Sequence, residues 1–306
     1  FTNTVSGIIS STGNTNAVTN NSVTATIGTL INQGQIRSEG TLPALNNSGT
    51  ITNFTNTSTG VIRNIGTASG ITNFLSTSTI QTLNNAGTIS GGTGSFGINN
   101  AGTISSLINT GTINGITNSR VITSFNNQQG ASSSALAYSG TLPTSYNIVV
   151  RSASDYGQLA VTSPSGATTF SIYSGGVSGV DASALSKGTY SSTITGISST
   201  NLTGATSGIY NGFNWSLNNS SGTLWDLVVT ASTADTQQSL VNNASALQNT
   251  FSLQNSILAN SFYYDCAVFD QNNVCISAGG RNTAVSAANG LNNTSGLLIA
   301  AYRPHA

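Results

Sequence analysis

Charged side chains are scarce in this sequence of 306 residues. Asp, Glu, Lys and Arg make up 5% of it, against about 25% in an ordinary soluble protein, and the formal net charge is zero. The arginines are scattered along the chain, and Lys187 is the single lysine. Because no basic patch is available to neutralise phosphates, we expect no nucleic-acid partner.

Groups for acid–base catalysis are equally rare. The single histidine, His305, is the penultimate residue, where an ordered catalytic base is not expected. Glu39 is the only acid before Asp155, so this region lacks the two carboxylates, about 5–10 Å apart, that glycoside hydrolysis needs. We therefore predict that the protein is not an enzyme and has no catalytic residues, no cofactor and no metal site.

Cysteine and long apolar runs are also nearly absent. Cys266 and Cys275 are the only cysteines, and they flank the turn-like stretch from Asp270 to Asn273. A hairpin there would bring the two thiols within bridging distance, so we predict a disulfide, with free thiols as the alternative. The sequence contains no run of 18 apolar residues, so we predict no membrane-spanning helix. The start at Phe1, without Met or an apolar leader, is expected of an excised fragment or of a chain whose signal was removed.

Small polar residues are abundant instead, with 47 Ser, 44 Thr and 38 Asn beside 34 Gly. A short motif recurs among them, in which an apolar residue is followed by Asn at position three, Gly at position five, Thr at six and Ile at seven. Close copies begin at Leu45, Leu83, Ile98 and Leu107, and looser ones at Leu30, Phe54, Phe74, Ile116 and Phe125. Repetition at a short period, with β-branched residues and tight turns, predicts a β-solenoid, with two or three repeats in each coil.

Each repeated position has an expected role. The apolar residues should point inward, and Gly at position five (Gly34, Gly49, Gly87, Gly102, Gly111) should allow a positive φ at a bend. The Thr at position six (Thr50, Thr88, Thr103, Thr112) indicates a solvent-facing β-strand, with an ice- or glycan-facing file as the alternative. The position-three asparagines should form a structural ladder along the axis, in which each amide bonds to the next coil: Asn47, Asn85, Asn100, Asn109, Asn118 and Asn127.

The pattern changes along the chain, which predicts four segments. Residues 1–145 form the repeat solenoid, and residues 146–231, with alternating runs and both tryptophans, form a β-rich cap. Residues 232–262 form one long polar helix, and residues 263–306 contain two further strands. The predicted fold class is all-β: a parallel β-helix with a β-rich C-terminal cap, followed by one long helix and two strands, which the resemblance given next assigns to the start of an incomplete β-barrel.

This order resembles a classical (type Va) autotransporter of Gram-negative bacteria. The most specific parts are the Asn-Asn-Ala-Gly-Thr-Ile repeats, the sequence from Leu224 to Leu227 (LWDL), and the sequences YDCAVFD (264–270) and VCIS (274–277). The last two are similar to the start of the barrel in vacuolating-cytotoxin-like members. The resemblance implies a passenger at the cell surface or released outside, anchored at the outer membrane through the barrel. It also implies a linker helix in the barrel pore and a C-terminal passenger segment that folds first.

One departure is that about 44 residues after Phe262 are too few to close such a barrel, so we expect a truncated chain or a barrel supplied elsewhere.

Three functions remain open. The first is a non-enzymatic adhesin and stalk, whose partner is a glycan or protein on a host or bacterial surface. The second is a toxin-like or host-receptor-binding passenger. The third is a polysaccharide-active β-helix enzyme, which a pair of acids in a groove would distinguish from the other two.

Overall fold

The computed structural model describes residues 1–177, 179–231, 233–263, 266–284 and 292–304. The chain divides into two compact units, Phe1–Ala231 and Ser232–Ala306. The predicted solenoid and cap share the first unit, and the predicted helix and last strands share the second. The predicted fold class is confirmed: a parallel β-solenoid is followed by one helix and then by strands.

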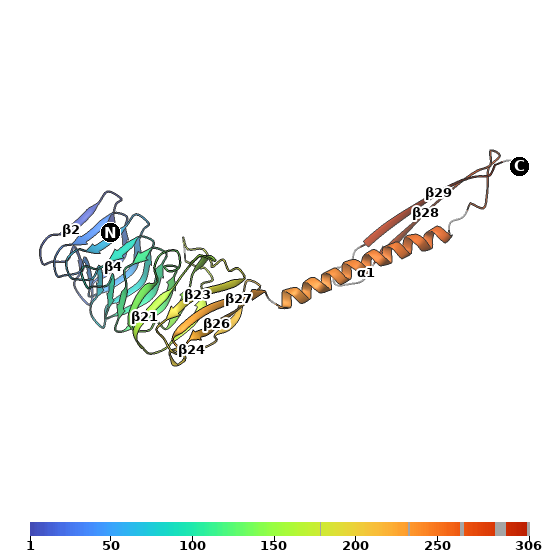
Figure 1. Cartoon of the computed structure of the whole chain (residues 1–306). Helices are drawn as coiled ribbons and strands as arrows, with labels where there is room; N and C mark the ends of the chain where they lie inside the picture. The colour runs from blue at the N-terminus through green and yellow to red at the C-terminus, as the bar shows by residue number, and fades with distance from the viewer. Residues whose placement is uncertain (178, 232, 264–265, 285–291, 305–306) are drawn as a thin grey trace. The chain divides into compact units, whose positions relative to one another are not determined.

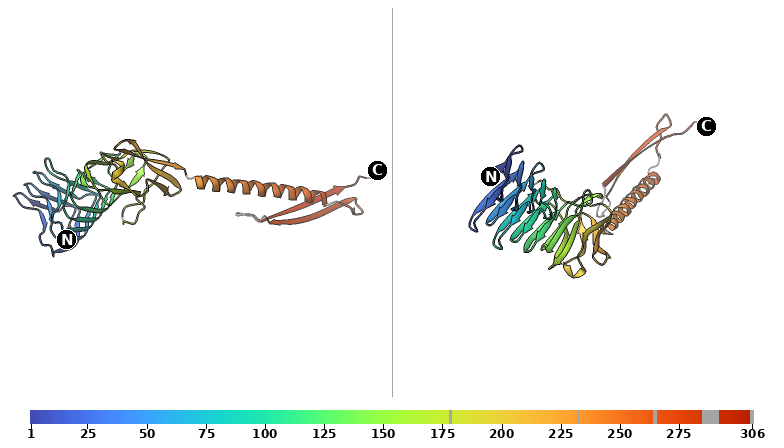
Figure 2. Two further views of the ribbon diagram at one scale, coloured as in Figure 1. Left: turned by 90° about the horizontal axis from the view of Figure 1, so that it is seen from below. Right: turned by 60° about the vertical axis from the view of Figure 1, so that its left-hand side comes forward.

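The first unit is built from three sheets that the chain visits in turn, so that successive coils stack along one axis (Figures 1 and 2). Sheet 1 contains β1 (Thr2–Asn3), β4 (Thr26–Asn32), β7 (Thr50–Asn56), β10 (Thr79–Asn85), β13 (Thr103–Asn109), β16 (Val121–Asn127), β18 (Ser145–Ile148), β22 (Thr168–Ile172) and β24 (Leu202–Thr203). Sheet 2 contains β2 (Ile8–Ser11), β5 (Gln35–Ser38), β8 (Val61–Asn64), β11 (Thr88–Ser90) and β14 (Thr112–Ile113). These pairings are all parallel, as a solenoid requires.

Sheet 3 begins parallel and ends antiparallel. Its parallel strands are β3 (Val18–Asn20), β6 (Leu45–Asn47), β9 (Ile71–Asn73), β12 (Ile98–Asn100), β15 (Ile116–Asn118), β17 (Leu136–Thr141), β21 (Leu159–Ser165) and β23 (Gly188–Thr195). The antiparallel strands β27 (Leu224–Ala231), β26 (Phe213–Ser221) and β25 (Ser207–Tyr210) then cover its end. Two short elements lie outside these sheets. The antiparallel pair β19 (Val150–Ser152) and β20 (Asp155–Tyr156) follows β18 in the chain, and a 3-10 turn at Ser199–Asn201 follows β23.

The core is a set of apolar files that run from coil to coil. Leu83 pairs in register with Phe54 in the coil before it and Leu107 in the coil after it, and all three are fully buried. Sheet 3 has a matching file in which Ile98 lies between Ile71 and Ile116. β-branched residues favour this arrangement because their side chains pack well on a pleated surface. Each coil therefore buries its apolar residues against its two neighbours.

A coil takes up two repeats, so the sequence alternates between sheets 1 and 3. Equivalent asparagines in successive coils are 24, 29, 24 and 18 residues apart. The differences come from turns of variable length. The turn from β9 to β10 (residues 74–78) is longer than that from β6 to β7 (48–49), and the loop from β14 to β15 (114–115) is shorter than that from β11 to β12 (91–97). Sheet 2 ends at β14, whereas sheets 1 and 3 continue into the cap.

The second unit contains α1 (Thr233–Tyr263), β28 (Val274–Ala284) and β29 (Asn292–Tyr302). The helix has 31 residues and begins and ends close to the predicted bounds. The strands pair antiparallel over all 11 of their residues. Among the described residues, no helix combines the length and the apolar character needed to cross a membrane.

Candidate functional site

The buried asparagines form two hydrogen-bonded ladders along the solenoid. Within each ladder, the Nδ2 atom of one asparagine donates to the Oδ1 atom of the asparagine in the following coil, at 2.7–3.2 Å. Ladder 1 lies at the C-terminal ends of the sheet 1 strands, and ladder 2 lies at the C-terminal ends of the sheet 3 strands. Ladder 1 contains Asn3, Asn32, Asn56, Asn85, Asn109 and Asn127, and ladder 2 contains Asn20, Asn47, Asn73, Asn100 and Asn118.

The six asparagines named from the sequence are divided between these ladders. Because a coil holds two repeats, every second asparagine along the chain is a neighbour in space, and consecutive ones are not. Two of the asparagines that were not named, Asn32 and Asn56, stand at position three of the looser repeats that begin at Leu30 and Phe54. Asn73 was missed because the repeat assigned to Phe74 begins at Ile71.

Asn85 illustrates how completely each ladder amide is used. Its Nδ2 atom donates to Asn109 Oδ1 at 2.8 Å and to the carbonyls of Gly87 and Thr112 at 3.3 Å, and its Oδ1 atom accepts from Asn56 Nδ2 at 2.8 Å. The side chain is fully buried. A buried amide without these partners would cost about 1–3 kcal/mol, so the ladder satisfies groups that the turns would otherwise leave unpaired.

The expectation for the position-five glycines is wrong. None of Gly34, Gly49, Gly87, Gly102 and Gly111 has a positive φ. They are required because of close approach instead: a Cβ atom on Gly87 would clash with the carbonyl oxygens of Gly60 and Thr57 in the preceding coil. The repeated glycine therefore sets the distance between coils and not the direction of a turn.

The position-six threonines do not form one file. Thr50 and Thr103 lie in sheet 1, where both pair with Thr79, whereas Thr88 and Thr112 pair with each other in sheet 2. The alternative of one file that contains all four named threonines is therefore wrong, although the register does align Thr26, Thr50, Thr79 and Thr103 on sheet 1.

Two tyrosines and one glutamine close the C-terminal ends of these arrays. Asn118 Nδ2 donates to the Tyr138 phenol at 2.9 Å, and Asn127 Nδ2 donates to the Tyr146 phenol at 3.4 Å. The Gln129 amide accepts from Ile113 N at 2.8 Å and donates to Ile113 O at 3.0 Å, so it replaces the strand that sheet 2 lacks after β14. Sequence reasoning missed all three, because they occur once and outside the repeat.

Burial raises the pKa of the Tyr138 and Tyr146 phenols well above their usual range. Because the folded pKa is the higher one, the stability that the neutral phenols contribute is present below about pH 10 and is lost as the pH rises above it. We expect Tyr138→Phe to lower the free energy of unfolding by about 1–3 kcal/mol at neutral pH, since it leaves Asn118 without its phenol partner. Urea denaturation at pH 7 and pH 11 measures both effects.

The exposed Tyr302 provides a matched control. Tyr302→Phe should leave the midpoint in urea unchanged, and a Tyr138→Phe, Tyr146→Phe double variant should lose less of its remaining stability between pH 7 and pH 11 than the parent chain. An unchanged midpoint for Tyr138→Phe would show that the phenol is not needed to end ladder 2.

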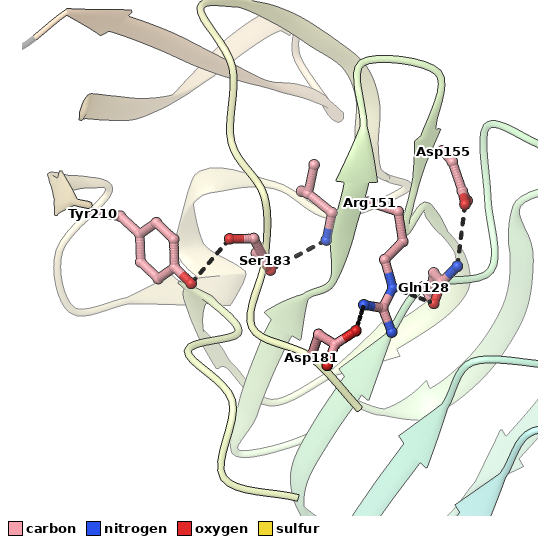
Figure 3. Close-up of polar contacts among 7 residues, drawn as sticks. Gln128, Arg151, Asp155, Asp181, Ser183 and Tyr210 are labelled. Atoms are coloured by element: carbon pink, nitrogen blue, oxygen red, sulfur yellow. Dashed lines mark hydrogen bonds and ion pairs between the residues drawn. The ribbon is translucent and has the colours of Figure 1, made fainter. Parts of the chain in front are cut away.

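A polar network joins the last regular coil to the cap (Figure 3). Gln128 follows β16, donates to Asp155 Oδ2 at 3.2 Å and accepts from Arg151 Nε at 3.2 Å. Arg151 also forms an ion pair with Asp181 at 3.2 Å. An arginine held between an amide and a carboxylate fixes a geometry but supplies no nucleophile, so we assign this cluster a structural role.

A second set of hydrogen bonds is centred on the buried Ser183, two residues after Asp181 in the chain. The Ser183 hydroxyl accepts from Val150 N at 3.2 Å and donates to Ile148 O at 3.2 Å, while its carbonyl accepts from the Tyr210 phenol at 3.2 Å (Figure 3). Tyr210 also donates to Tyr173 O at 3.1 Å. These bonds attach the segment that contains Asp181 and Ser183 to the end of sheet 1 and to β25.

The structure joins Cys266 and Cys275 in a disulfide. The intervening turn is closed by Asp270, whose Oδ1 atom accepts from Asn272 N at 2.9 Å and Val274 N at 2.8 Å. The Arg303 guanidinium lies over the Phe269 ring, 4.8 Å from its centroid. Among the described residues, no three His, Cys, Asp or Glu side chains are grouped as a metal site would require, and His305 lies outside them.

A groove of about 440 Å³ lies on the outside of sheet 3, beside the loops at residues 39–44, 65–70 and 91–97. Its floor contains Asn46, Thr72 and Asn99, which occupy one register position on β6, β9 and β12. Leu42 and Phe74 form apolar parts of its wall, and Phe74 is 58% exposed.

Comparisons with protein-family models, with curated proteins and with solved structures found no match to this chain.

Proposed function

We propose that this chain is part of the passenger of an autotransporter: a non-enzymatic stalk and adhesive surface outside the cell, whose C-terminal segment begins its folding. The observation that carries the proposal is the polarity of the asparagine ladders. Every ladder Nδ2 atom donates towards the C-terminal end, where phenol and carbonyl groups accept from the last asparagines. Each further coil added on the N-terminal side brings donors for the Oδ1 atoms already in place.

The aromatic contacts of the core continue in the same direction, towards the C-terminal end. The sheet 1 file of Phe125, Tyr146 and Phe170 extends to Trp215 on β26, with ring centroids 5.7, 6.2 and 5.8 Å apart. Trp225 and Leu227 on β27 are buried beside it, and Trp225 Nε1 donates to Ile197 O at 2.9 Å. The cap therefore contains large aromatic contacts and closed hydrogen bonds, which suit it to form before the repeats do.

We further propose that the second unit anchors the chain at the outer membrane. On the β28–β29 hairpin, Val274, Ile276, Leu298 and Tyr302 are exposed, and the register places them on one face. Strands of about 9–11 residues with one apolar face have the length and pattern of strands that cross an outer membrane. α1 exposes polar residues together with large apolar ones, which are Leu240, Val241, Leu247, Phe251 and Leu258, so its surface is mixed.

Two fully buried leucines test where folding begins. We expect Leu227→Ala in the cap to slow refolding at least about tenfold, because a residue in the folding nucleus affects the folding rate. Leu30→Ala in β4 removes the same atoms at the other end, and it should mainly speed unfolding. Stopped-flow refolding followed by tryptophan fluorescence and by pulsed hydrogen exchange measures both variants.

Pulsed hydrogen exchange measures the order in which the amides of each coil become protected. In the parent chain, amides in β16 should gain protection before those in β4. Equal slowing of refolding by both variants, or earlier protection of β4, would contradict a folding start at the C-terminal end.

A further inference from the structure

The groove on sheet 3 has features of a preformed binding site. Its loops are joined across coils: Ser95 Oγ donates to Thr67 O at 2.7 Å, and Gly92 N donates to Ala68 O at 2.8 Å. Asn64 Nδ2 holds the third loop by donating to Leu42 O at 2.8 Å. Loops fixed in this way lose little conformational entropy when a ligand binds. A volume of about 440 Å³ also lies within the usual range for small-molecule sites.

The chemistry of the lining is neutral and mixed. None of the residues that line the groove carries a charge. Asn46, Thr72 and Asn99 stand on adjacent strands about 4.8 Å apart, so they present amides and hydroxyls at a regular spacing. The Asn16 side chain, at the rim, has a shielded Oδ1 atom without a hydrogen-bond partner. Phe74 adds an exposed aromatic ring.

These features distinguish between ligand classes. A phosphate or acidic sugar would need a cation, which the lining lacks. A peptide strand would need an open sheet edge, whereas β9 is paired on both sides by β6 and β12. A neutral sugar needs hydrogen-bond donors and acceptors for its hydroxyls and a flat apolar surface for its C–H face, and the groove supplies both.

We propose that this groove binds a neutral oligosaccharide, with one ring stacked on Phe74 and its hydroxyls bonded to Asn46 and Asn99. The inference rests on the proposed adhesive function, for which it names a ligand class and a site. Phe74 is distinctive here because the equivalent position after β6, β12 and β15 is Ser48, Ala101 and Ser119. The ring therefore marks one coil of the solenoid and not the repeat as a whole.

The full chain should be applied to an array of neutral, sialylated and sulfated oligosaccharides, and the affinity for bound neutral glycans should be measured by titration calorimetry. We expect Phe74→Ala and Asn99→Ala each to weaken binding at least about tenfold, and Phe74→Trp to retain it. Phe1→Ala is the matched control, because Phe1 is 57% exposed and lies outside the groove; its affinity should equal that of the parent chain. Circular dichroism checks that each variant is folded.

The proposal would be overturned if the folded chain bound no neutral glycan, if it bound acidic glycans only, or if Phe74→Ala and Asn99→Ala left binding unchanged. Displacement of a bound glycan by an uncharged peptide of equal affinity would also contradict it. The refolding experiment is independent of this one. A chain that folds from its cap but binds no sugar would therefore refute the glycan site and leave the passenger proposal in place.

Discussion

Asn85→Asp is expected to lower the free energy of unfolding by about 3–5 kcal/mol at neutral pH, although the two side chains have nearly the same shape. The carboxylate can still accept from Asn56, but its second oxygen would face the oxygens of Asn109, Gly87 and Thr112, to which the amide nitrogen now donates. A buried charge would thus meet acceptors where the ladder needs a donor.

The same substitution should make stability depend on pH. Burial among oxygen atoms raises the pKa of an aspartic acid at this position, so the folded state favours the protonated form. The loss of stability should therefore be smallest near pH 3 and should grow as the pH rises towards 7. Chemical denaturation at several pH values measures it.

Asn53→Asp is the control for Asn85→Asp. Asn53 lies on β7 in the adjacent coil, pairs in register with Thr82 and is exposed, so this change should cost less than about 0.5 kcal/mol. Equal effects at the two positions, or a loss at Asn85 that does not vary with pH, would mean that the ladder contributes little to stability.

Gly87→Ala is expected to destabilise the solenoid by about 3 kcal/mol or more, through steric overlap and not through backbone strain. The new methyl group would overlap carbonyl oxygens of the preceding coil, and the main chain on both sides is fixed by hydrogen bonds between coils. Neither neighbour can move without separating the stack. Thermal unfolding followed by circular dichroism measures the change.

Gly28→Ala provides the comparison. Gly28 lies in β4, and nothing stands within 4 Å of a Cβ atom placed on it. Its replacement should leave stability unchanged or raise it by about 0.4–1 kcal/mol, because alanine restricts the unfolded chain. If Gly87→Ala were equally harmless, the coils would not be packed at the separation that the structure describes.

The solenoid could be predicted from the sequence because residues at equivalent positions in successive coils are of the same type. Each coil makes the same contacts as the next, so the residues that face inward, stack or approach closely recur at fixed positions. The asparagine at position three and the apolar residues at positions one and seven could be recognised for this reason. Loop insertions change the spacing, however, and they concealed that Asn73 belongs with Ile71 and not with Phe74.

Features that occur once could not be predicted in the same way. Gln129 closes the edge of sheet 2 and Tyr138 ends ladder 2, but each depends on where the neighbouring coil places a backbone or side-chain amide. The role of Gly87 depends on a carbonyl that lies 27 residues earlier in the sequence. The groove likewise requires three loops from three coils to meet, and the Gly-Thr pair that these loops share, at residues 40–41, 66–67 and 92–93, does not by itself indicate a groove.

The central claim is that successive coils stack in register whatever the number of residues between them. Spin labels can test it through cysteines placed in pairs with Thr29 at positions that the register aligns on sheet 1: Asn53, Thr82, Ser106 and Ser124. The distance between labels, measured by electron paramagnetic resonance, should grow by about 4.8 Å with each coil, although 24, 29, 24 and 18 residues separate equivalent positions. Distances that follow the sequence separation, or that show no regular increase, would contradict the stacked solenoid.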